Sequence, residues 1–215
     1  MNISTELATD FNDIKSSIQM LEKRIEIEPG NHHTMHMLGY YYYMQGNFKK
    51  AITIFDKVVD IKPNTALSHY YLGLCYYRTA NLEQALKSLT LAVGIDPEFC
   101  LAFYWIGRIQ FYSGKTQKAI ETLKKCMEKD AESLIAIYDL ACMYMHIDQH
   151  KEAIELLERL LEMDSNNANA YYQLGVAFDK LGWHSEAKLH LEKALEMDAG
   201  NENAQTLIER ISTTH

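Results

Sequence analysis

The sequence has little of what long linkers and membrane spans require. It contains only three prolines and ten glycines in 215 residues, which leaves no room for a long flexible linker. No window approaches the roughly 18 apolar residues of a spanning helix, and the first residues show no basic region followed by an apolar run. We therefore expect a soluble, cytoplasmic protein with no secretory signal and no membrane insertion.

A surplus of basic residues is also missing. The chain has 21 Lys and Arg against 29 Asp and Glu, a formal net charge of −8. Phosphate backbones are bound by clustered Lys and Arg, so the sequence predicts no nucleic-acid partner. The acidic surplus favours solubility.

The four cysteines, Cys75, Cys100, Cys126 and Cys142, form no CxxC pair. Each lies in a helical pattern at a position where a small apolar residue would serve. We expect reduced thiols that pack in the core, with a disulfide or a zinc site as the alternatives.

Catalytic motifs are absent as well. The chain has no glycine-rich phosphate loop, no GxSxG and no HExxH. His32, His33 and His36 could present imidazoles to a metal, but no carboxylate or thiol stands beside them in the sequence. The sequence therefore predicts no enzyme, no cofactor and no metal site.

What is present is a repeat of 34 residues, best seen between Ala66 and Phe99. Large apolar residues at helical spacing surround small residues such as Gly73 and Ala85, which predicts two helices in close contact joined by a short turn. One alanine recurs at that period five times, at Ala51, Ala85, Ala119, Ala153 and Ala187. A glycine recurs at Gly39, Gly73, Gly107 and Gly175. An internal period of this length indicates one continuous array of helix pairs.

The repeat sets the domain boundaries. Five full units are predicted at 32–65, 66–99, 100–133, 134–167 and 168–201, between an N-terminal capping helix within 1–31 and a C-terminal capping helix within 202–215. Residues Met1 to Asp10 are expected to fray. Pro63 and Pro97 end the second helices of the first two units, and we expect the same turn without proline in the other three.

This pattern resembles the tetratricopeptide repeat (TPR) family, in which small and large residues recur at set positions of a 34-residue unit. Unit one supplies Met35, Leu38, Gly39, Tyr42, Ala51, Phe55, Val58 and Pro63. The resemblance covers residues 32–201. It implies an all-α fold, a right-handed superhelical solenoid of about five helix-turn-helix repeats plus half-unit caps. It also implies that the first helices line a concave groove that binds a segment of another protein.

Family positions that tend to face the groove carry aromatic, aliphatic and arginine side chains here. The residues that the resemblance places in a peptide-binding groove are His36, Tyr40, Tyr43, Tyr70, Tyr71, Leu74, Tyr77, Arg78, Tyr104, Trp105, Arg108, Phe111, Tyr138, Cys142 and Tyr172. Tyr, Trp and Arg dominate the energetics of protein interfaces. The alternative is that these side chains only pack neighbouring first helices together.

One subclass of the family holds the C-terminal carboxylate of chaperones with Lys, Asn and Arg at set groove positions. The chain has His36, Tyr40, Tyr71, Leu101 and Trp105 there instead, so no chaperone tail of that kind is expected. An apolar extended segment or an amphipathic helix fits better.

The leading functional hypothesis is a non-enzymatic adaptor or scaffold that binds a peptide or amphipathic helix of a partner protein. Three alternatives remain: a self-assembling scaffold, which would form a homo-oligomer; an accessory subunit of an enzyme or secretion complex; and RNA binding, which the acidic charge disfavours.

Overall fold

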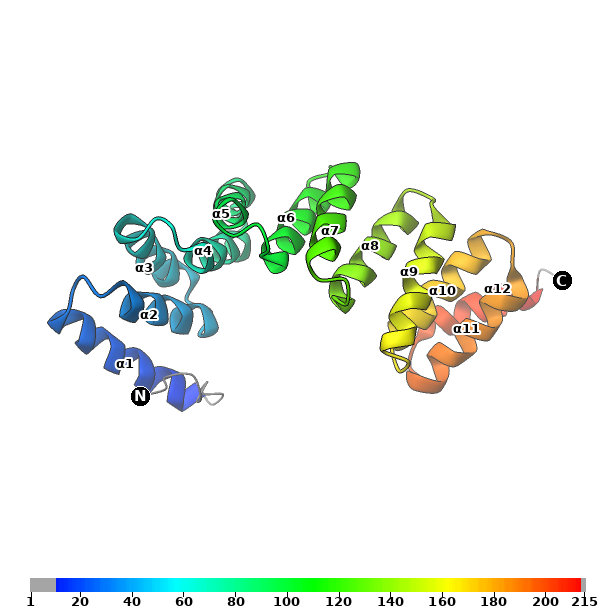
Figure 1. Cartoon of the computed structure of the whole chain (residues 1–215). Helices are drawn as coiled ribbons and strands as arrows, with labels where there is room; N and C mark the ends of the chain where they lie inside the picture. Colours follow the sequence, from blue (N-terminus) through cyan, green and yellow to red (C-terminus); the bar gives the residue numbers. More distant parts are fainter. Residues whose placement is uncertain (1–10, 214–215) are drawn as a thin grey trace. The chain divides into compact units, whose positions relative to one another are not determined.

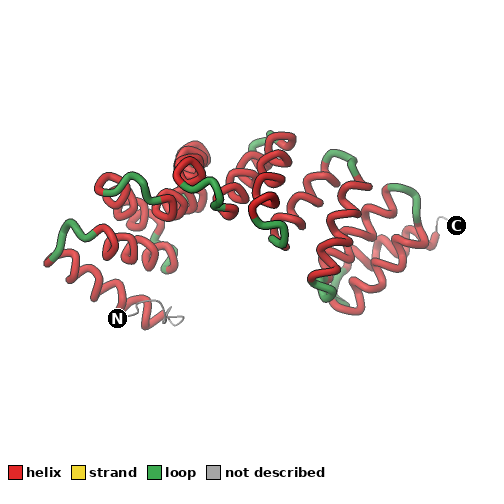
Figure 2. The backbone as a smooth tube through the Cα atoms, in the orientation of Figure 1, coloured by secondary structure: helices red, strands yellow, loops and turns green. Residues whose placement is uncertain are grey.

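The computed structural model describes residues 11–213, and this part of the chain forms twelve α-helices and no strand (Figure 1). Helix α1 (Phe11–Ile27) precedes five helix pairs. The first helices of the pairs are α2 (His32–Met44), α4 (Ala66–Arg78), α6 (Cys100–Tyr112), α8 (Leu134–His146) and α10 (Ala168–Lys180). The second helices are α3 (Phe48–Ile61), α5 (Leu82–Ile95), α7 (Thr116–Lys129), α9 (His150–Met163) and α11 (His184–Met197), and α12 (Glu202–Thr213) follows. Short loops join the helices (Figure 2), and the fold is an all-α helical repeat solenoid.

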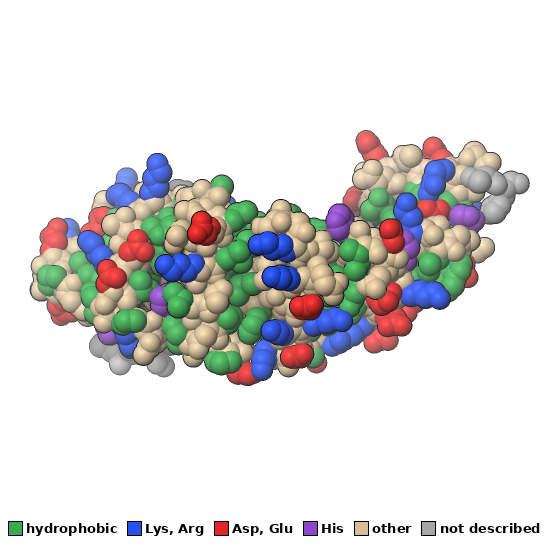
Figure 3. Space-filling model, turned by 90° about the horizontal axis from the view of Figure 1, so that it is seen from above, with side chains coloured by type: hydrophobic (Ala, Val, Ile, Leu, Met, Phe, Trp, Pro, Cys, Tyr) green, Lys and Arg blue, Asp and Glu red, His purple; other side chains and the backbone are tan. Residues whose placement is uncertain are grey.

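The chain divides into two compact units, Met1–Ile109 and Gln110–His215, with the division inside α6. Their charges differ. The first unit contains 10 Lys or Arg and 11 Asp or Glu, whereas the second contains 11 and 18. The acidic surplus of the chain therefore belongs almost entirely to the second unit. On the face shown in Figure 3, hydrophobic side chains (green) are scattered among charged ones of both signs.

Small residues lie where the two helices of a pair touch. A Cβ atom added at Gly73 in α4 would stand 2.6 Å from Cγ of Leu89 in α5. A Cβ atom added at Gly175 in α10 would likewise stand 2.5 Å from Cγ of Leu191 in α11. The alanines of the 34-residue ladder, Ala51, Ala85, Ala119, Ala153 and Ala187, have no exposed surface. The close approach predicted from the sequence is confirmed, because a larger side chain at these positions has no space.

The turn inside each pair has a left-handed residue at the same point of the repeat. These residues are Gly46 (φ 79°), Ala80 (φ 61°), Gly114 (φ 73°), Asp148 (φ 59°) and Gly182 (φ 76°). Glycine adopts this conformation without a steric cost, whereas alanine does not. The turns recur at the 34-residue period, and two of them have a residue other than glycine at this position, Ala80 and Asp148.

The turns between pairs keep one geometry with or without proline. Asp96, which precedes Pro97, has φ −125° and ψ 95°, and Asp130, which precedes Ala131, has φ −139° and ψ 90°. In both turns the aspartate side chain accepts a hydrogen bond from the backbone N–H two residues later, at 3.0 and 3.2 Å. The local hydrogen bond supports both turns, and the turn at Asp130 keeps the same geometry without proline, as predicted from the sequence.

Single helices lie at both ends of the described chain. Ile14, Ile18 and Leu21 of α1 are buried in the core of the first unit. At the other end α12 buries Ala204 and Ile211. Met1 to Asp10, for which fraying is predicted, and the last two residues of the predicted C-terminal cap lie outside the described residues.

The cysteines differ from one another. Cys75 and Cys142 have free thiols, and Cys75 is buried, as expected for packing residues. Cys100 and Cys126 are each disulfide-bonded, so the expectation of four reduced thiols is wrong for these two. Helical spacing shows where a thiol can pack, but it does not show which sulfur atoms come close enough to bond.

Candidate functional site

Tyr71 is the centre of an aromatic cluster in the first unit. Its ring centroid lies 5.2 Å from that of Tyr40, 5.6 Å from Tyr43 and 5.9 Å from His36, all on α2, with edge-on geometry. On another side it stacks on Phe55 of α3, with 5.8 Å between centroids and 7° between the planes. Aromatic pairs at these distances attract one another. The cluster therefore links α2, α3 and α4.

The cluster continues to α6. Tyr70 has its ring centroid 5.3 Å from that of Tyr71, and Trp105 on α6 reaches the rings of α4. Trp105 also lies 5.0 Å from Tyr77 and 5.6 Å from Tyr104 between ring centroids. We use the name aromatic face for the partly exposed members on the first helices: His36, Tyr40, Tyr43, Tyr71, Tyr77 and Trp105.

Three residues predicted for the groove are buried instead of open to a ligand. Tyr70 is 8% exposed, Leu74 4% and Tyr104 2%. Tyr70 and Leu74 belong to a hydrophobic core cluster of the first unit. These three side chains therefore pack neighbouring helices together, which is the alternative that the sequence left open.

The two arginines of the predicted site contact rings. Arg78 is exposed, and its guanidinium carbon lies 5.1 Å from the centroid of Phe48. Arg108 donates a hydrogen bond to the Tyr104 hydroxyl at 3.1 Å and lies 5.3 Å from the Trp105 centroid. Cation–π contacts of this kind hold a guanidinium against an aromatic surface.

The aromatic face has no negative charge of its own at neutral pH. Helices α2, α4 and α6 contain no Asp or Glu. Burial, with a smaller contribution from His33, lowers the pKa of His36 to about 4, so its imidazole is neutral. Burial, followed by the neighbouring tyrosines, raises the pKa of Tyr71 to about 12. The face is therefore a neutral, hydroxyl-bearing aromatic surface flanked by arginine.

The remaining predicted residues lie in the second unit. Phe111 packs edge-on against His146, with 5.2 Å between ring centroids. Tyr138 and Cys142 share α8, and burial, followed by the nearby Cys142, raises the pKa of Tyr138 to about 12. Tyr172 on α10 is partly exposed. No ring contact joins Tyr138 or Tyr172 to another aromatic side chain within residues 110–213, so this group is sparser than the aromatic face.

Sequence reasoning missed two aromatic residues of the first unit. Phe48 lies 5.8 Å from Tyr43, and Phe99 lies 4.9 Å from Tyr70, between ring centroids. Both stand outside the first helices, Phe48 at the start of α3 and Phe99 just before α6. An aromatic residue at the boundary of a helix could have indicated that both belong to the cluster. The predicted groove, however, included only residues of first helices.

Two kinds of site are not found in the part of the chain that the structure describes. Residues 11–213 contain no group of three or more His, Cys, Asp or Glu that could hold a metal ion. No helix among them is both long and apolar enough to cross a membrane.

Family models match both parts of the chain. Residues 10–92 match the model described as anaphase-promoting complex, cyclosome, subunit 3. Residues 110–174 and 148–211 match the tetratricopeptide repeat model. A search of curated proteins found no match.

Solved structures share the fold. MamA is 27% identical over 77% of this chain and 97% of its own, with a TM-score of 0.71. YrrB, described as a TPR protein with an unusual peptide-binding site, is 18% identical over 86% of this chain and 96% of its own, with a TM-score of 0.75. PilF of Pseudomonas aeruginosa is 17% identical over 85% of this chain and 83% of its own, with a TM-score of 0.73. Together with the 34-residue period and the close-packed helix pairs, these matches show that the chain belongs to the tetratricopeptide repeat family.

Proposed function

We propose that the chain is a non-catalytic adaptor or scaffold that binds a segment of a partner protein on the aromatic face. The tetratricopeptide fold is a protein-interaction fold. In this proposal the five 34-residue units are the framework, and the first helices of the first unit carry the site. The observation that supports it is the linked set of partly exposed rings centred on Tyr71.

The chemistry of this face indicates the kind of partner. Tyr and Trp provide a large contact area with few rotatable bonds, and their polar groups can still form hydrogen bonds. The face lacks the Lys and Asn that a carboxylate clamp requires. The ligand we propose is therefore an apolar extended segment or the apolar side of an amphipathic helix.

Tyr77→Ala provides a test that spares the core. Tyr77 is partly exposed, and its ring contacts Trp105 on the neighbouring first helix. We expect the change to weaken binding of the partner by about 1–3 kcal/mol, while the helical circular dichroism and the melting temperature stay close to wild type. Leu91→Ala is the matched control, because Leu91 is 46% exposed on the second helix α5.

The partner can be captured with a photo-crosslinking amino acid placed at Tyr77 or, as the control, at Leu91. Adducts formed in the lysate at Tyr77 and not at Leu91 support the aromatic face. Equal labelling at the two positions, or equal affinity of both alanine variants for the captured partner, would contradict it. If the captured protein is a second copy of the chain, the self-assembling scaffold becomes the better function.

A further inference from the structure

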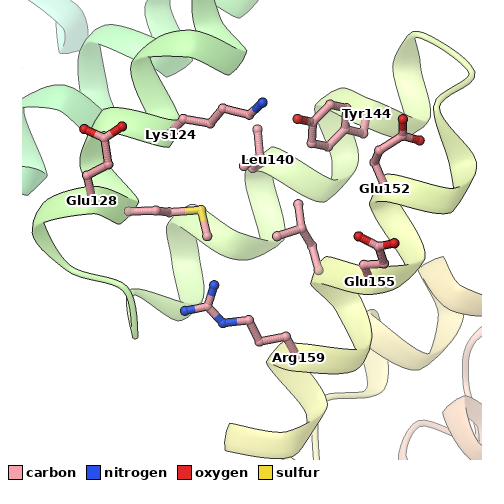
Figure 4. Close-up of a pocket in the computed structure, with 9 residues that line it drawn as sticks. Lys124, Glu128, Leu140, Tyr144, Glu152, Glu155 and Arg159 are labelled. Carbon is pink, nitrogen blue, oxygen red and sulfur yellow. The ribbon is translucent and has the colours of Figure 1, made fainter.

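The second unit has a hollow of about 560 Å³ between α7, α8 and α9 (Figure 4). Its apolar surface comes from Met127 on α7, Leu140 and Tyr144 on α8, and Leu156 on α9. Leu140 is 2% exposed, so it forms part of a fixed core. Ligand pockets in proteins commonly have volumes of roughly 300–1,000 Å³. The hollow is thus large enough for one or two bulky side chains of a docked segment.

The two cations at the edge of the hollow are held by the protein itself. A hydrogen bond with Tyr144 raises the pKa of Lys124, and the charges of Glu121 and Glu152 raise it further. The ammonium group of Lys124 lies 5.6 Å from the Tyr144 ring centroid. Arg159 donates a hydrogen bond to the backbone carbonyl of Ala131. Figure 4 shows these two side chains at opposite ends of the hollow. They are engaged with groups of the same unit.

Three carboxylates complete the edge. Glu128 lies on the α7 side, and Glu152 and Glu155 lie along the α9 side (Figure 4). All three side chains are exposed, and within residues 11–213 none forms an ion pair. Glu152 and Glu155 are three residues apart on α9, so both point from one side of that helix. Three carboxylates against the two cations Lys124 and Arg159 leave the edge with a net charge of −1, and two of the three carboxylates are on the α9 side of the apolar floor.

The charge around the hollow is uneven: α7 carries four Lys against two Glu, so the acidic surplus lies on the α9 side. Helix α9 carries four Glu against one Lys and one Arg, and the second unit as a whole has 18 acidic and 11 basic residues. The negative charge of α9 and the net charge of the unit repel phosphate and acidic peptides and attract basic ones.

We propose that this hollow docks a basic amphipathic helix of a partner protein. An apolar side chain of that helix enters the hollow over Leu140 and Leu156, and its Lys or Arg side chains pair with Glu152 and Glu155. This site is separate from the aromatic face and does not depend on the function proposed above.

The probe is a pair of synthetic amphipathic helical peptides with the same Leu and Trp face and either Lys or Glu on the polar face. Fluorescence anisotropy at low salt measures their binding to the full chain. We expect the Lys peptide to bind and the Glu peptide not to bind, because only the Lys peptide complements the carboxylates.

Two double variants of α9 separate a specific site from general attraction. Glu152→Gln with Glu155→Gln should weaken binding of the Lys peptide roughly three- to tenfold, because two ion pairs are lost. Glu158→Gln with Glu162→Gln makes the same change of net charge on the same helix, outside the hollow, and should leave the affinity unchanged. Met127→Gln, nearly equal in volume, should also weaken binding by making the floor polar.

Three results would overturn the proposal. Equal losses in the two double variants would mean that the peptide binds only the net charge of the unit. Binding of the Glu peptide would show that the carboxylates at the edge do not select a basic helix. Self-association in analytical ultracentrifugation that Glu152→Gln with Glu155→Gln abolishes would make a second copy of the chain the occupant.

Discussion

The two units have the same helix pairs but different surfaces. In the first unit, rings on α2, α4 and α6 form the aromatic face, and basic and acidic residues are nearly equal in number. In the second, α8 and α10 carry fewer linked rings, and most of the chain's acidic surplus is found there. The positions that hold helices together repeat in both units, whereas the exposed positions do not.

This difference shows how a repeat scaffold separates folding from recognition. Gly73 in the first unit and Gly175 in the second face Leu89 and Leu191 in nearly the same way. Because each pair contacts only its neighbours, the exposed positions of one unit can change without altering the packing of the other. Two chemically distinct surfaces on one chain are the result.

The largest expected effect comes from emptying the core of one unit at a time. Phe55 and Leu191 have no exposed surface. Phe55→Ala should cost about 3–5 kcal/mol and Leu191→Ala about 2–5 kcal/mol. Hydrogen exchange should show loss of protection mainly in α2 to α5 for the first variant and in α10 to α12 for the second. Equal loss across the whole chain in both variants would mean that the units unfold together.

The glycine contacts test what the units share. Gly73→Ala and Gly175→Ala should each lower stability by roughly 1–3 kcal/mol, since the new Cβ would overlap a leucine side chain. Gly94→Ala is the control: it lies in α5 with nothing within 4 Å of an added Cβ, and should be neutral or stabilising. Chemical denaturation measures all three. A neutral result at Gly73 or Gly175 would contradict the close approach of the helices.

Acid should weaken the first unit through His36. Burial holds the pKa of this imidazole at about 4, below its ordinary value of 6.5. Between these pH values the unfolded chain binds a proton that the folded chain does not, so the stabilising effect is present above pH 6.5 and is lost as pH falls towards 4. We expect a loss of about 1–2 kcal/mol. His36→Gln should flatten the pH dependence of stability, and an unchanged profile would show that His36 is not responsible.

The smallest effect concerns the left-handed turns. Ala80→Gly should stabilise the first unit by up to about 1 kcal/mol, because glycine relieves the strain of a positive φ at Ala80. Asp148→Gly should change little, since aspartate tolerates this conformation better than alanine does. Thermal melts of both variants measure the difference. A lower melting temperature for Ala80→Gly would show that the positive φ at Ala80 does not strain the folded chain.

Much of the fold could be predicted because the repeat signals are local. Helix length, turn position and the buried alanines all follow from residues within one 34-residue period, as Ala85 and Ala80 illustrate. The site was harder to predict. Tyr70 and Tyr71 are adjacent and of one type, yet the first is buried and the second is partly exposed, because neighbouring helices cover them differently. The hollow beside Leu140 was missed entirely, since its edge consists of residues that look like an ordinary solvated helix face.

The sequence by itself determined the helices, their pairing and the family, because hydrophobic periodicity and small residues at fixed spacing leave few other ways to bury apolar surface. Only the tertiary structure decided which rings meet around Tyr71, that the His36 imidazole loses its basicity, and that Glu152 and Glu155 border an apolar hollow. These properties depend on distances between side chains of different helices, which residue spacing along the chain does not specify.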